Sequence, residues 1–416
     1  MNVRITPHPL RGTVGAIGSK SDIHRLLICA AMSDSATEIS GVTMSEDVRA
    51  TIECVRSMGA KVAVSEDKCT VIPYNPAENP IFDCGESGST LRFMLPCASA
   101  VCGGGRFIGR GRLPRRPIGE LAAAMKSGGV RFSADTLPLT VTGRLTAGRY
   151  EIAGNVSSQY ISGLLMALSV TKGSSILHLT TPLESARYVD MTLETLKLFG
   201  GEIQVNDSEY TIIGHDRLTS PRSARADGDW SNAAFFLTAA ALGGEVTVTG
   251  LRNGSLQGDR RIIDILQTFG AKTAINDNNI TVKSNSLSGC EIDLTHIPDL
   301  LPILAAAASF GSGETVFTGG ARLRIKESDR LRTVADMINA LGGRAVERSD
   351  GLIVSGGGLT GGTVDGAEDH RIVMAASIAA AYCTESVTII GAEAVNKSYP
   401  EFFEHFKMLG GECSVL

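Results

Sequence analysis

The sequence predicts an α/β protein made of six copies of one folding unit, arranged as two domains. Three observations support this prediction: apolar helical stretches that recur along the chain, amphipathic helices that each end at a glycine, and β-branched segments between the helices. Because 416 residues exceed what one ordinary hydrophobic core accommodates, we expect two domains of three units each.

The first helix of each unit is apolar nearly all round, which predicts burial on every side. Each helix begins with small or acidic residues that can cap it. In the last three units, Asp229, Asp299 and Asp369 occupy matching places at equal spacing. The six helical segments are SKSDIHRLLICAAM, ESGSTLRFMLPCASA, VSSQYISGLLMALS, GDWSNAAFFLTAAAL, IPDLLPILAAAAS and EDHRIVMAASIAAA.

A second, amphipathic helix follows in each unit and ends at a glycine before a strand-like segment. In the fifth unit, Leu331, Val334, Ile338 and Leu341 recur at helical spacing. Glycine is expected at such a helix end because it adopts a positive φ without strain. The six glycines are Gly59, Gly129, Gly200, Gly270, Gly342 and Gly410.

Segments rich in β-branched residues, such as GEVTVTG, ETVFTG and SVTIIG, predict strands bounded by glycine. Each unit is therefore expected to run strand, helix, strand, helix, strand, strand. A helix followed by glycine and a strand is common in α/β proteins, but six recurrences at one shared period favour a true repeat.

Composition excludes several classes of protein. The net charge of −5 argues against a nucleic-acid partner, which needs a basic surface. Nine cysteines without a Cys-x-x-Cys pair, and dispersed histidines, favour free thiols in the cytoplasm and predict no metal or organic cofactor. The first residues lack the apolar stretch of a signal peptide, and the longest apolar run is shorter than the ~20 residues that span a bilayer. We therefore expect a cytoplasmic protein without a membrane partner.

Positively charged side chains stand at the start of the first apolar helix. Lys20 and Arg25 lie within its first turns, and Ser21 shares a helix face with Arg25. The stretch GSKS falls short of a phosphate-binding P-loop, which needs glycine directly before the lysine. A helix start capped by Ser19 or Ser21, with a lysine beside it, still favours an anion. Arg25 on an apolar helix needs a partner, and an anionic ligand is one candidate; a snorkelling side chain is the alternative.

Similar polar residues open other helices or lie in loops nearby. A glycine- and hydroxyl-rich turn precedes the second apolar helix, three polar residues open the third, and an arginine directly before Pro117 is held rigidly. These stretches supply Gly88, Arg92, Ser157, Ser158, Gln159 and Arg116.

The stretch LRIKESDRLR has the highest density of charge. Lys326 and Arg330 are four residues apart, and Glu327 and Arg330 are three apart, so the three side chains can face one point. An exposed, salt-bridged first helical turn is the alternative. Asp299 stands at the head of an apolar helix, either as an N-cap or as a catalytic base. Arg371 and Lys397 occupy comparable positions near helix starts, whose dipoles favour anions.

Eight stretches, in this order, resemble the 5-enolpyruvylshikimate-3-phosphate (EPSP) synthase family over nearly the whole chain. They are GSKSDIHR, ESGSTLR, RRPIGEL, SSQYISGLLMAL, IPD, KESDRL, EDHRIVMA and KSYPEFF. The resemblance implies two inside-out α/β barrel domains, each built from three βαβαββ units with buried helices. It also implies that the chain crosses between the domains twice, so that residues 18–227 form one domain and residues 1–17 plus 228–416 form the other.

The resemblance implies a monomeric transferase of the shikimate pathway to chorismate and the aromatic amino acids, and a target of the herbicide glyphosate. Its small-molecule substrates are phosphoenolpyruvate and 3-phosphoshikimate, and the enolpyruvyl group moves to the 5-hydroxyl with release of phosphate. The reaction is an addition followed by an elimination, so protons must be both given and taken. Each substrate carries a phosphate and a carboxylate, which explains the need for many cations.

The resemblance also implies roles for particular residues. The residues that hold 3-phosphoshikimate are Lys20, Ser21, Arg25, Ser157, Ser158, Gln159, Ser185, Asp299 and Lys326, with Tyr188 nearby. The residues that hold phosphoenolpyruvate are Lys20, Gly88, Arg116, Gln159, Arg330, Arg371 and Lys397. Asp299 is expected to accept the hydroxyl proton and Glu327 to protonate the methylene carbon, with Lys20 assisting. Arg92 is expected to support the glycine turn.

Two positions depart from the family pattern: Glu86 and Arg322 stand where relatives usually have asparagine.

Two alternative functions stay open. The sister enolpyruvyl transferases that act on UDP-N-acetylglucosamine share the fold, but they have a catalytic cysteine on the loop that corresponds to Gly109–Arg116, and this loop has none. A non-catalytic repeat scaffold, in which the polar helix starts are only caps, is the other alternative.

Overall fold

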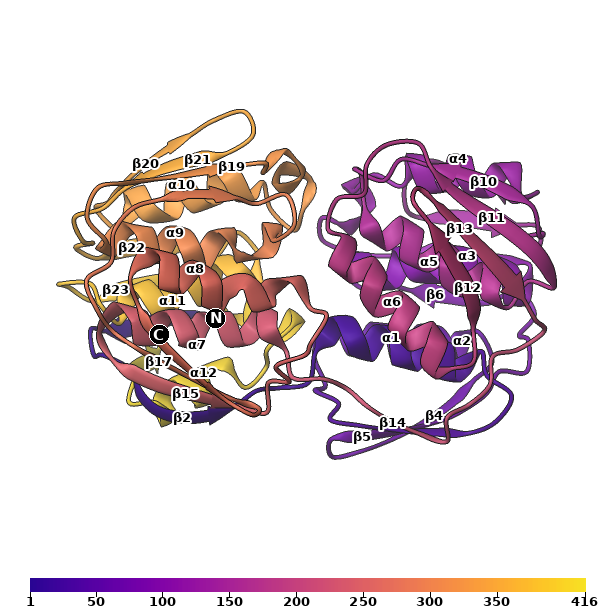
Figure 1. Cartoon of the computed structure of the whole chain (residues 1–416), viewed down its shortest axis with the longest axis horizontal. Helices are drawn as coiled ribbons and strands as arrows, with labels where there is room; N and C mark the ends of the chain where they lie inside the picture. Colours follow the sequence, from indigo (N-terminus) through magenta and orange to yellow (C-terminus); the bar gives the residue numbers. More distant parts are fainter. The chain divides into compact units, whose positions relative to one another are not determined.

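The structure, a computed structural model, describes all residues from 1 to 416. The chain divides into two compact units (Figure 1). Unit 1 comprises Met1–Ile17 and Asp227–Leu416, and unit 2 comprises Gly18–Ala226. No helix of either unit is long and apolar enough to cross a membrane.

Unit 2 contains three apolar helices, each followed by an amphipathic one. The apolar helices are α1 (Lys20–Ala31), α3 (Gly88–Cys102) and α5 (Ser158–Ser169). The amphipathic helices are α2 (Glu46–Ser57), α4 (Gly119–Ser127) and α6 (Ala186–Leu198), and a short 3-10 helix, η1 (Leu113–Arg115), precedes α4. The strands are β3 (Thr37–Ser40), β4 (Lys61–Ser65), β5 (Lys68–Ile72), β6 (Ile81–Asp83), β7 (Gly104–Ile108), β8 (Arg131–Phe132), β9 (Leu139–Thr142), β10 (Arg149–Ile152), β11 (Gly173–Leu179), β12 (Glu202–Asn206), β13 (Glu209–Gly214) and β14 (Ser223–Arg225).

Unit 1 repeats the pattern. The apolar helices are α7 (Trp230–Gly243), α9 (Leu301–Phe310) and α11 (His370–Ala380), and the second helices are α8 (Ile262–Phe269), α10 (Arg330–Ala340) and α12 (Phe402–Met408). The 3-10 helices are η2 (Gly258–Arg261), η3 (Pro298–Leu300), η4 (Ala321–Ile325) and η5 (Ala392–Lys397). The strands are β1 (Asn2–Thr6), β2 (Arg11–Gly15), β15 (Glu245–Thr249), β16 (Lys272–Asn276), β17 (Asn279–Lys283), β18 (Glu291–Asp293), β19 (Glu314–Thr318), β20 (Arg344–Glu347), β21 (Leu352–Ser355), β22 (Gly362–Asp365), β23 (Val387–Ile390) and β24 (Glu412–Val415).

All six sheets have four strands and share one strand order. In the sheet β10-β11-β13-β12, for example, β10 and β11 are parallel, and the other two pairings are antiparallel. A buried helix connects the parallel pair, as a parallel connection requires. The predicted βαβαββ unit and the fold class are therefore confirmed.

Three strands join sheets whose other strands lie far away in the sequence. In unit 2, β14 pairs in parallel with β3 and so completes the first repeat. In unit 1, β2 pairs in parallel with β15, and β1 lies between β23 and β24. The first sixteen residues of the chain thus supply strands to two sheets that residues 245–415 otherwise form.

Predicted features of the repeat are confirmed in detail. All six glycines that follow the second helices have positive φ, between 72° and 115°. Leu331, Val334, Ile338 and Leu341 of the fifth repeat are fully buried on one face of α10. Glycine is needed there because other residues rarely adopt these φ values.

The apolar helices form the centre of each unit. In unit 1, α7, α9 and α11 pack against one another, and in unit 2, α3 packs against α1 and α5. Gly163 of α5 allows the closest approach, because a Cβ atom there would lie 2.5 Å from the carbonyl oxygen of Arg92 in α3. Only glycine fits such a backbone contact without movement of one helix.

Replacement of Gly163 by alanine is therefore expected to push α3 and α5 apart. We expect Gly163→Ala to lower the free energy of unfolding by about 1–3 kcal/mol, the usual cost of overpacking a core. Urea titration of both proteins measures the loss. Gly119→Ala is the matched control, since Gly119 also lies in a helix but a Cβ atom added there would meet nothing within 4 Å. Equal stability of the two variants would contradict the argument.

Candidate active site

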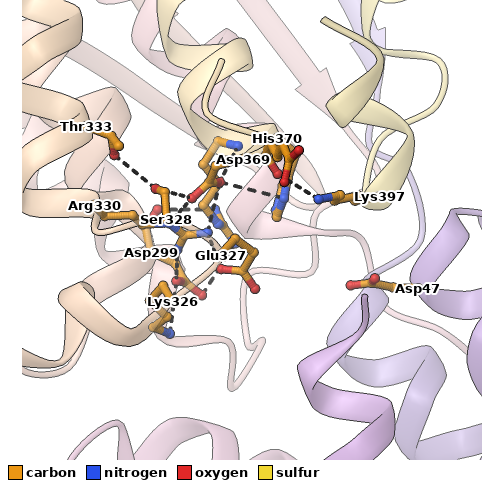
Figure 2. A network of polar contacts seen from close by, with 12 residues as sticks. Asp47, Asp299, Lys326, Glu327, Ser328, Arg330, Thr333, Asp369, His370 and Lys397 are labelled. Carbon is orange, nitrogen blue, oxygen red and sulfur yellow. Dashed lines mark hydrogen bonds and ion pairs between the residues drawn. The ribbon is translucent and has the colours of Figure 1, made fainter. Parts of the chain in front are cut away.

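In unit 1, the predicted charged residues gather where α9, α10 and α11 begin (Figure 2). Helix α10 starts at Arg330 because the Asp329 side chain accepts a hydrogen bond from the Arg332 amide at 3.4 Å. Lys326 and Glu327 therefore lie in the turn before the helix, so the helical spacing inferred from the sequence is wrong. The three side chains meet nonetheless, because Lys326 and Arg330 both contact Asp299 and Arg330 also donates to Glu327.

The guanidinium of Arg330 is the centre of this network, and only 1% of the residue is exposed. Its Nε donates to Asp369 Oδ2 at 2.8 Å, its Nη1 donates to Asp299 Oδ1 at 2.7 Å, and its Nη2 donates to Glu327 Oε2 at 2.8 Å. Burial alone would lower the pKa of Arg330, but the three carboxylates outweigh burial and raise it. Arg330 is thus a permanent cation that holds three acids around one point.

Asp299 lies among three cations. Besides Arg330, Lys326 Nζ lies 3.3 Å from Oδ1, and Arg371 Nη2 lies 3.5 Å from Oδ2. Burial would raise the pKa of this carboxyl, but Lys326, Arg371 and Arg330 hold it well below its usual value. Asp299 lies inside η3 and does not cap a helix, which removes the N-cap alternative.

Asp369 is the residue that sequence reasoning undervalued. It caps α11 by accepting from the Arg371 amide at 3.0 Å, and its Oδ2 also accepts from the Ser328 hydroxyl at 3.0 Å. Its equal spacing from Asp229 and Asp299 was the available signal, but the sequence does not show that Arg330 reaches it. Nearby, Lys397 Nζ donates to the carbonyl oxygen of Glu368 at 2.7 Å.

In unit 2, Lys20 at the start of α1 forms an ion pair with Asp47 at 2.8 Å. Both side chains are mostly buried. Sequence reasoning missed Asp47, which lies in the first turn of α2 after the capping residue Ser45. Ser19 is the N-cap residue of α1, which was one of the two predicted alternatives, but its side chain does not cap the helix. Ser19 precedes the helix, but its hydroxyl has no hydrogen-bond partner, and only its carbonyl oxygen takes part, accepting from two amides of the first turn.

Arg25 is buried and is held by neutral oxygen atoms of its own unit. Nε donates to the Thr192 hydroxyl at 2.7 Å, and Nη2 donates to the carbonyl oxygen of Tyr188 at 2.7 Å and, more weakly, to the Ser162 hydroxyl at 3.5 Å. Nη1 donates to the carbonyl oxygen of Ser21 at 2.5 Å. Arg25 therefore has partners within the protein, as its burial requires, and it does not snorkel to the surface. Burial lowers the pKa of Arg25 to about 10, since no carboxylate hydrogen-bonds to it.

A second group of residues surrounds Gly88, at the start of α3. A Cβ atom at Gly88 would lie 2.6 Å from Arg116 Nη1 and 2.9 Å from Arg92 Nη1, so both guanidinium groups lie against the turn. Arg92 Nη1 also donates to Gln159 Oε1 at 2.7 Å, and Gln159 Nε2 donates to the Ser89 hydroxyl at 2.9 Å. Gly88, Arg116 and Gln159 are thus brought together, with Arg92 between them.

The loop Gly109–Arg116 contains four arginines, and only Arg116 is buried; Arg110, Arg112 and Arg115 are partly or fully exposed. Glu86 turns onto this loop, since its carboxyl group lies 2.5 Å from the position of a Cβ atom on Gly111. The other departure from the family pattern, Arg322, lies in unit 1 and donates to the carbonyl oxygen of Thr295 at 2.7 Å.

The predicted serines lie at the starts of α5 and α6. Ser157 caps α5 by accepting from the Gln159 amide at 3.3 Å, and Ser158 is the first residue of that helix. Ser185 precedes α6 in a left-handed conformation with φ of 53°. Arg25 of α1 bonds to Ser162 of α5 and Tyr188 of α6, each about one turn after these serines.

Six repeats with buried apolar helices and polar residues at their starts define the enolpyruvyl transferase class of fold. The enolpyruvyl transferase NikO from Streptomyces tendae matches over 99% of this chain and 98% of its own, with a TM-score of 0.83 and 19% identity. EPSP synthase from Acinetobacter baumannii matches over 100% of both chains, with a TM-score of 0.82 and 27% identity.

Sequence comparison identifies the particular family. Residues 5–406 match EPSP synthase (3-phosphoshikimate 1-carboxyvinyltransferase). The 3-phosphoshikimate 1-carboxyvinyltransferase of Clostridium beijerinckii is 39% identical over 424 residues, which cover 99% of this chain and 98% of that protein. The chain belongs to the EPSP synthase family, and the predicted resemblance is confirmed.

The buried ion pair between Arg330 and Asp369 can be tested by an isosteric change. Asp369→Asn keeps a helix-capping side chain but removes its negative charge, and we expect a loss of about 3–5 kcal/mol in the free energy of unfolding. Urea titration measures this loss. Asp336→Asn is the control, because Asp336 pairs with Arg332 on the surface and should cost less than about 1 kcal/mol. A loss as small as that of the control would contradict the central role of Arg330.

Proposed function

We propose that this chain transfers the enolpyruvyl group of phosphoenolpyruvate to the 5-hydroxyl of 3-phosphoshikimate, with release of phosphate. The observation that supports this most directly is the pair of acids, Asp299 and Glu327, held on one buried guanidinium beside further cations. The reaction needs a proton acceptor and a proton donor near several anionic groups, and this cluster supplies both. Release of phosphate only when both substrates are present is the primary test.

Asp299 acts as the base in this proposal. Its pKa is held low by cations, so the carboxylate is ionised and ready to accept the proton of the attacking hydroxyl. Lys326 and Arg371 depress that pKa, and both are also assigned to substrates. When they turn toward a substrate anion, their hold on Asp299 weakens and the carboxylate becomes a stronger base.

In this proposal Glu327 is the general acid that protonates the methylene carbon of phosphoenolpyruvate. In the addition, the methylene carbon of phosphoenolpyruvate gains a proton while the 5-hydroxyl oxygen bonds to the neighbouring carbon. In the elimination, the resulting methyl group loses a proton as phosphate leaves. Glu327 Oε2 accepts a hydrogen bond from Arg330 Nη2, and the side chain is partly exposed, so a substrate can reach this carboxyl group; Lys20 assists in the exchange.

Cations of both units neutralise the two substrates. We assign 3-phosphoshikimate to Lys20, Ser21, Arg25, Ser157, Ser158, Gln159, Ser185, Asp299 and Lys326. We assign phosphoenolpyruvate to Lys20, Gly88, Arg116, Gln159, Arg330, Arg371 and Lys397. The donors of Arg330 are engaged by carboxylates, so its contact with phosphoenolpyruvate requires exchange of one acid for the substrate carboxylate. Arg25 has no carboxylate among its hydrogen-bond partners, so its buried charge favours an anion close by.

The alternatives have less support. The loop Gly109–Arg116 lacks the cysteine expected of transferases that act on UDP-N-acetylglucosamine. A scaffold has no use for a buried guanidinium among three carboxylates, because apolar residues stabilise a core as well. We also propose that the chain acts as a monomer in the cytoplasm, in keeping with its nine free cysteines.

Isosteric variants of the two acids test the mechanism. We expect Glu327→Gln and Asp299→Asn to lower kcat by about 10²–10⁴-fold, the usual contribution of general acid–base catalysis. Calorimetry should show similar affinity for 3-phosphoshikimate. Glu347→Gln, which removes the charge of an exposed glutamate paired with Arg324, is the control and should keep full activity. Unchanged turnover in both variants would remove the acid–base assignment.

Substrate binding should also bring the two sets of ligands together, since each substrate is assigned residues from both units. We expect 3-phosphoshikimate with phosphoenolpyruvate to reduce the radius of gyration measured by small-angle X-ray scattering. Shikimate, which lacks the phosphate, serves as the control. An unchanged radius at saturating substrate would count against shared ligands.

A further inference from the structure

Inside unit 2, a row of four buried polar side chains joins three helices. His24 Nδ1 of α1 lies 2.6 Å from the Thr51 hydroxyl of α2, and that hydroxyl lies 2.7 Å from the Thr90 hydroxyl of α3. Thr90 in turn donates to the Ser87 hydroxyl at 2.7 Å. All four residues are at most 1% exposed. None of them belongs to the ligand sets assigned above.

The direction of the hydrogen bonds in this row follows from counting protons. Each hydroxyl has one proton to donate. Thr90 gives its proton to Ser87, so Thr51 must donate to Thr90. The Thr51 oxygen then accepts from His24, which requires the imidazole proton to be on Nδ1. The remaining ring nitrogen, Nε2, then bears no proton in the neutral ring, and it has no hydrogen-bond partner.

The imidazole is therefore neutral and fixed in one tautomer. Burial lowers the pKa of His24 well below its usual value, and the charges of Lys20 and Arg25 lower it further. Phe93 of α3 packs against both His24 and Arg25. The Phe93 and His24 rings form a T-shaped pair, and Arg25 Cζ lies 5.1 Å from the centroid of the Phe93 ring. The ring position of His24 is thus set from two sides.

The two ends of the row are next to the proposed ligands. His24 lies one helical turn after Lys20 and directly precedes Arg25. At the other end, Ser87 caps α3 by accepting from the Thr90 amide at 3.2 Å, and the next residue is Gly88, against which Arg116 lies. The Thr90 hydroxyl donates to the capping residue Ser87 and accepts from Thr51. The Gly88 turn therefore cannot shift without breaking one of these hydrogen bonds.

We propose that His24, Thr51, Thr90 and Ser87 form a hydrogen-bonded brace that positions the Gly88 turn, and with it Arg116, relative to Lys20. These are positioning residues, since none of them needs to touch a substrate. The kinetic test of this brace rests on the proposed function, in which Lys20, Arg116 and the turn at Gly88 bind phosphoenolpyruvate. The tautomer of His24 tests it without any reference to activity.

The decisive variant is Thr51→Val, which keeps the shape of the side chain and removes the central hydroxyl. We expect the KM for phosphoenolpyruvate to rise about tenfold, in line with the loss of buried hydrogen bonds that order a binding turn, while the KM for 3-phosphoshikimate changes less than about twofold. Thr51→Ser restores the hydroxyl and should restore the KM. Thr195→Val is the matched control, because that buried hydroxyl bonds only to the carbonyl oxygen of Met191 within its own helix.

The tautomer is read from ¹⁵N chemical shifts of histidine-labelled protein. We expect the native His24 ring to be neutral at pH 7 with its proton on Nδ1, and we expect Thr51→Val to shift the Nδ1 resonance. A native ring protonated on Nε2, or on both nitrogens, would overturn the proposal. So would a KM for phosphoenolpyruvate that rises equally in Thr51→Val and Thr195→Val, or that Thr51→Ser does not restore. Absence of turnover in the native enzyme would instead contradict the proposed function and leave the tautomer test in force.

Discussion

Burial of six apolar helices is the constraint on which the rest of this structure depends. A helix that is enclosed on all sides has no exposed face for charged residues, so charged side chains are confined to its first turns. The amides at a helix start favour acceptors and anions. The repeat therefore produces, in each unit, a set of helix starts where serines, aspartates and arginines collect, and the proposed site follows from that placement.

Arg25 and Arg330, two of the buried arginines, show how differently one fold can stabilise a guanidinium. Arg330 is enclosed by three carboxylates, which raise its pKa, whereas Arg25 is enclosed by hydroxyls and carbonyl oxygens, and its pKa falls to about 10. A buried cation without a carboxylate is costly unless another anion compensates for it. The counter-charges of Arg330 thus hydrogen-bond to it directly, whereas Asp22 acts on Arg25 without a hydrogen bond, and we propose that a substrate anion adds to that compensation.

Much of this arrangement could be predicted from the sequence, because helix periodicity and glycine at helix ends are local signals. The apolar helices and the six glycines with positive φ were predicted from them. Contacts between residues distant in the sequence were not predicted. Examples are the ion pair of Lys20 with Asp47 and the ion pair of Arg330 with Asp369. The spacing of Lys326 and Arg330 predicted their meeting for the wrong reason, since the Asp329 cap starts the helix after Lys326. Likewise, hydroxyls near a helix start do not always cap it, as Ser19 shows.

The position of β1 has a consequence for how the polypeptide reaches this fold. This strand lies near the N-terminus, yet its two neighbours, β23 and β24, are the last strands of the chain. During synthesis β1 must wait, unpaired, until nearly every other residue has been made. Closing such a long loop is entropically slow, so completion of this sheet is a late step in assembly. In unit 2 the corresponding wait is shorter, since β3 meets its partner β14 once residue 225 has been made.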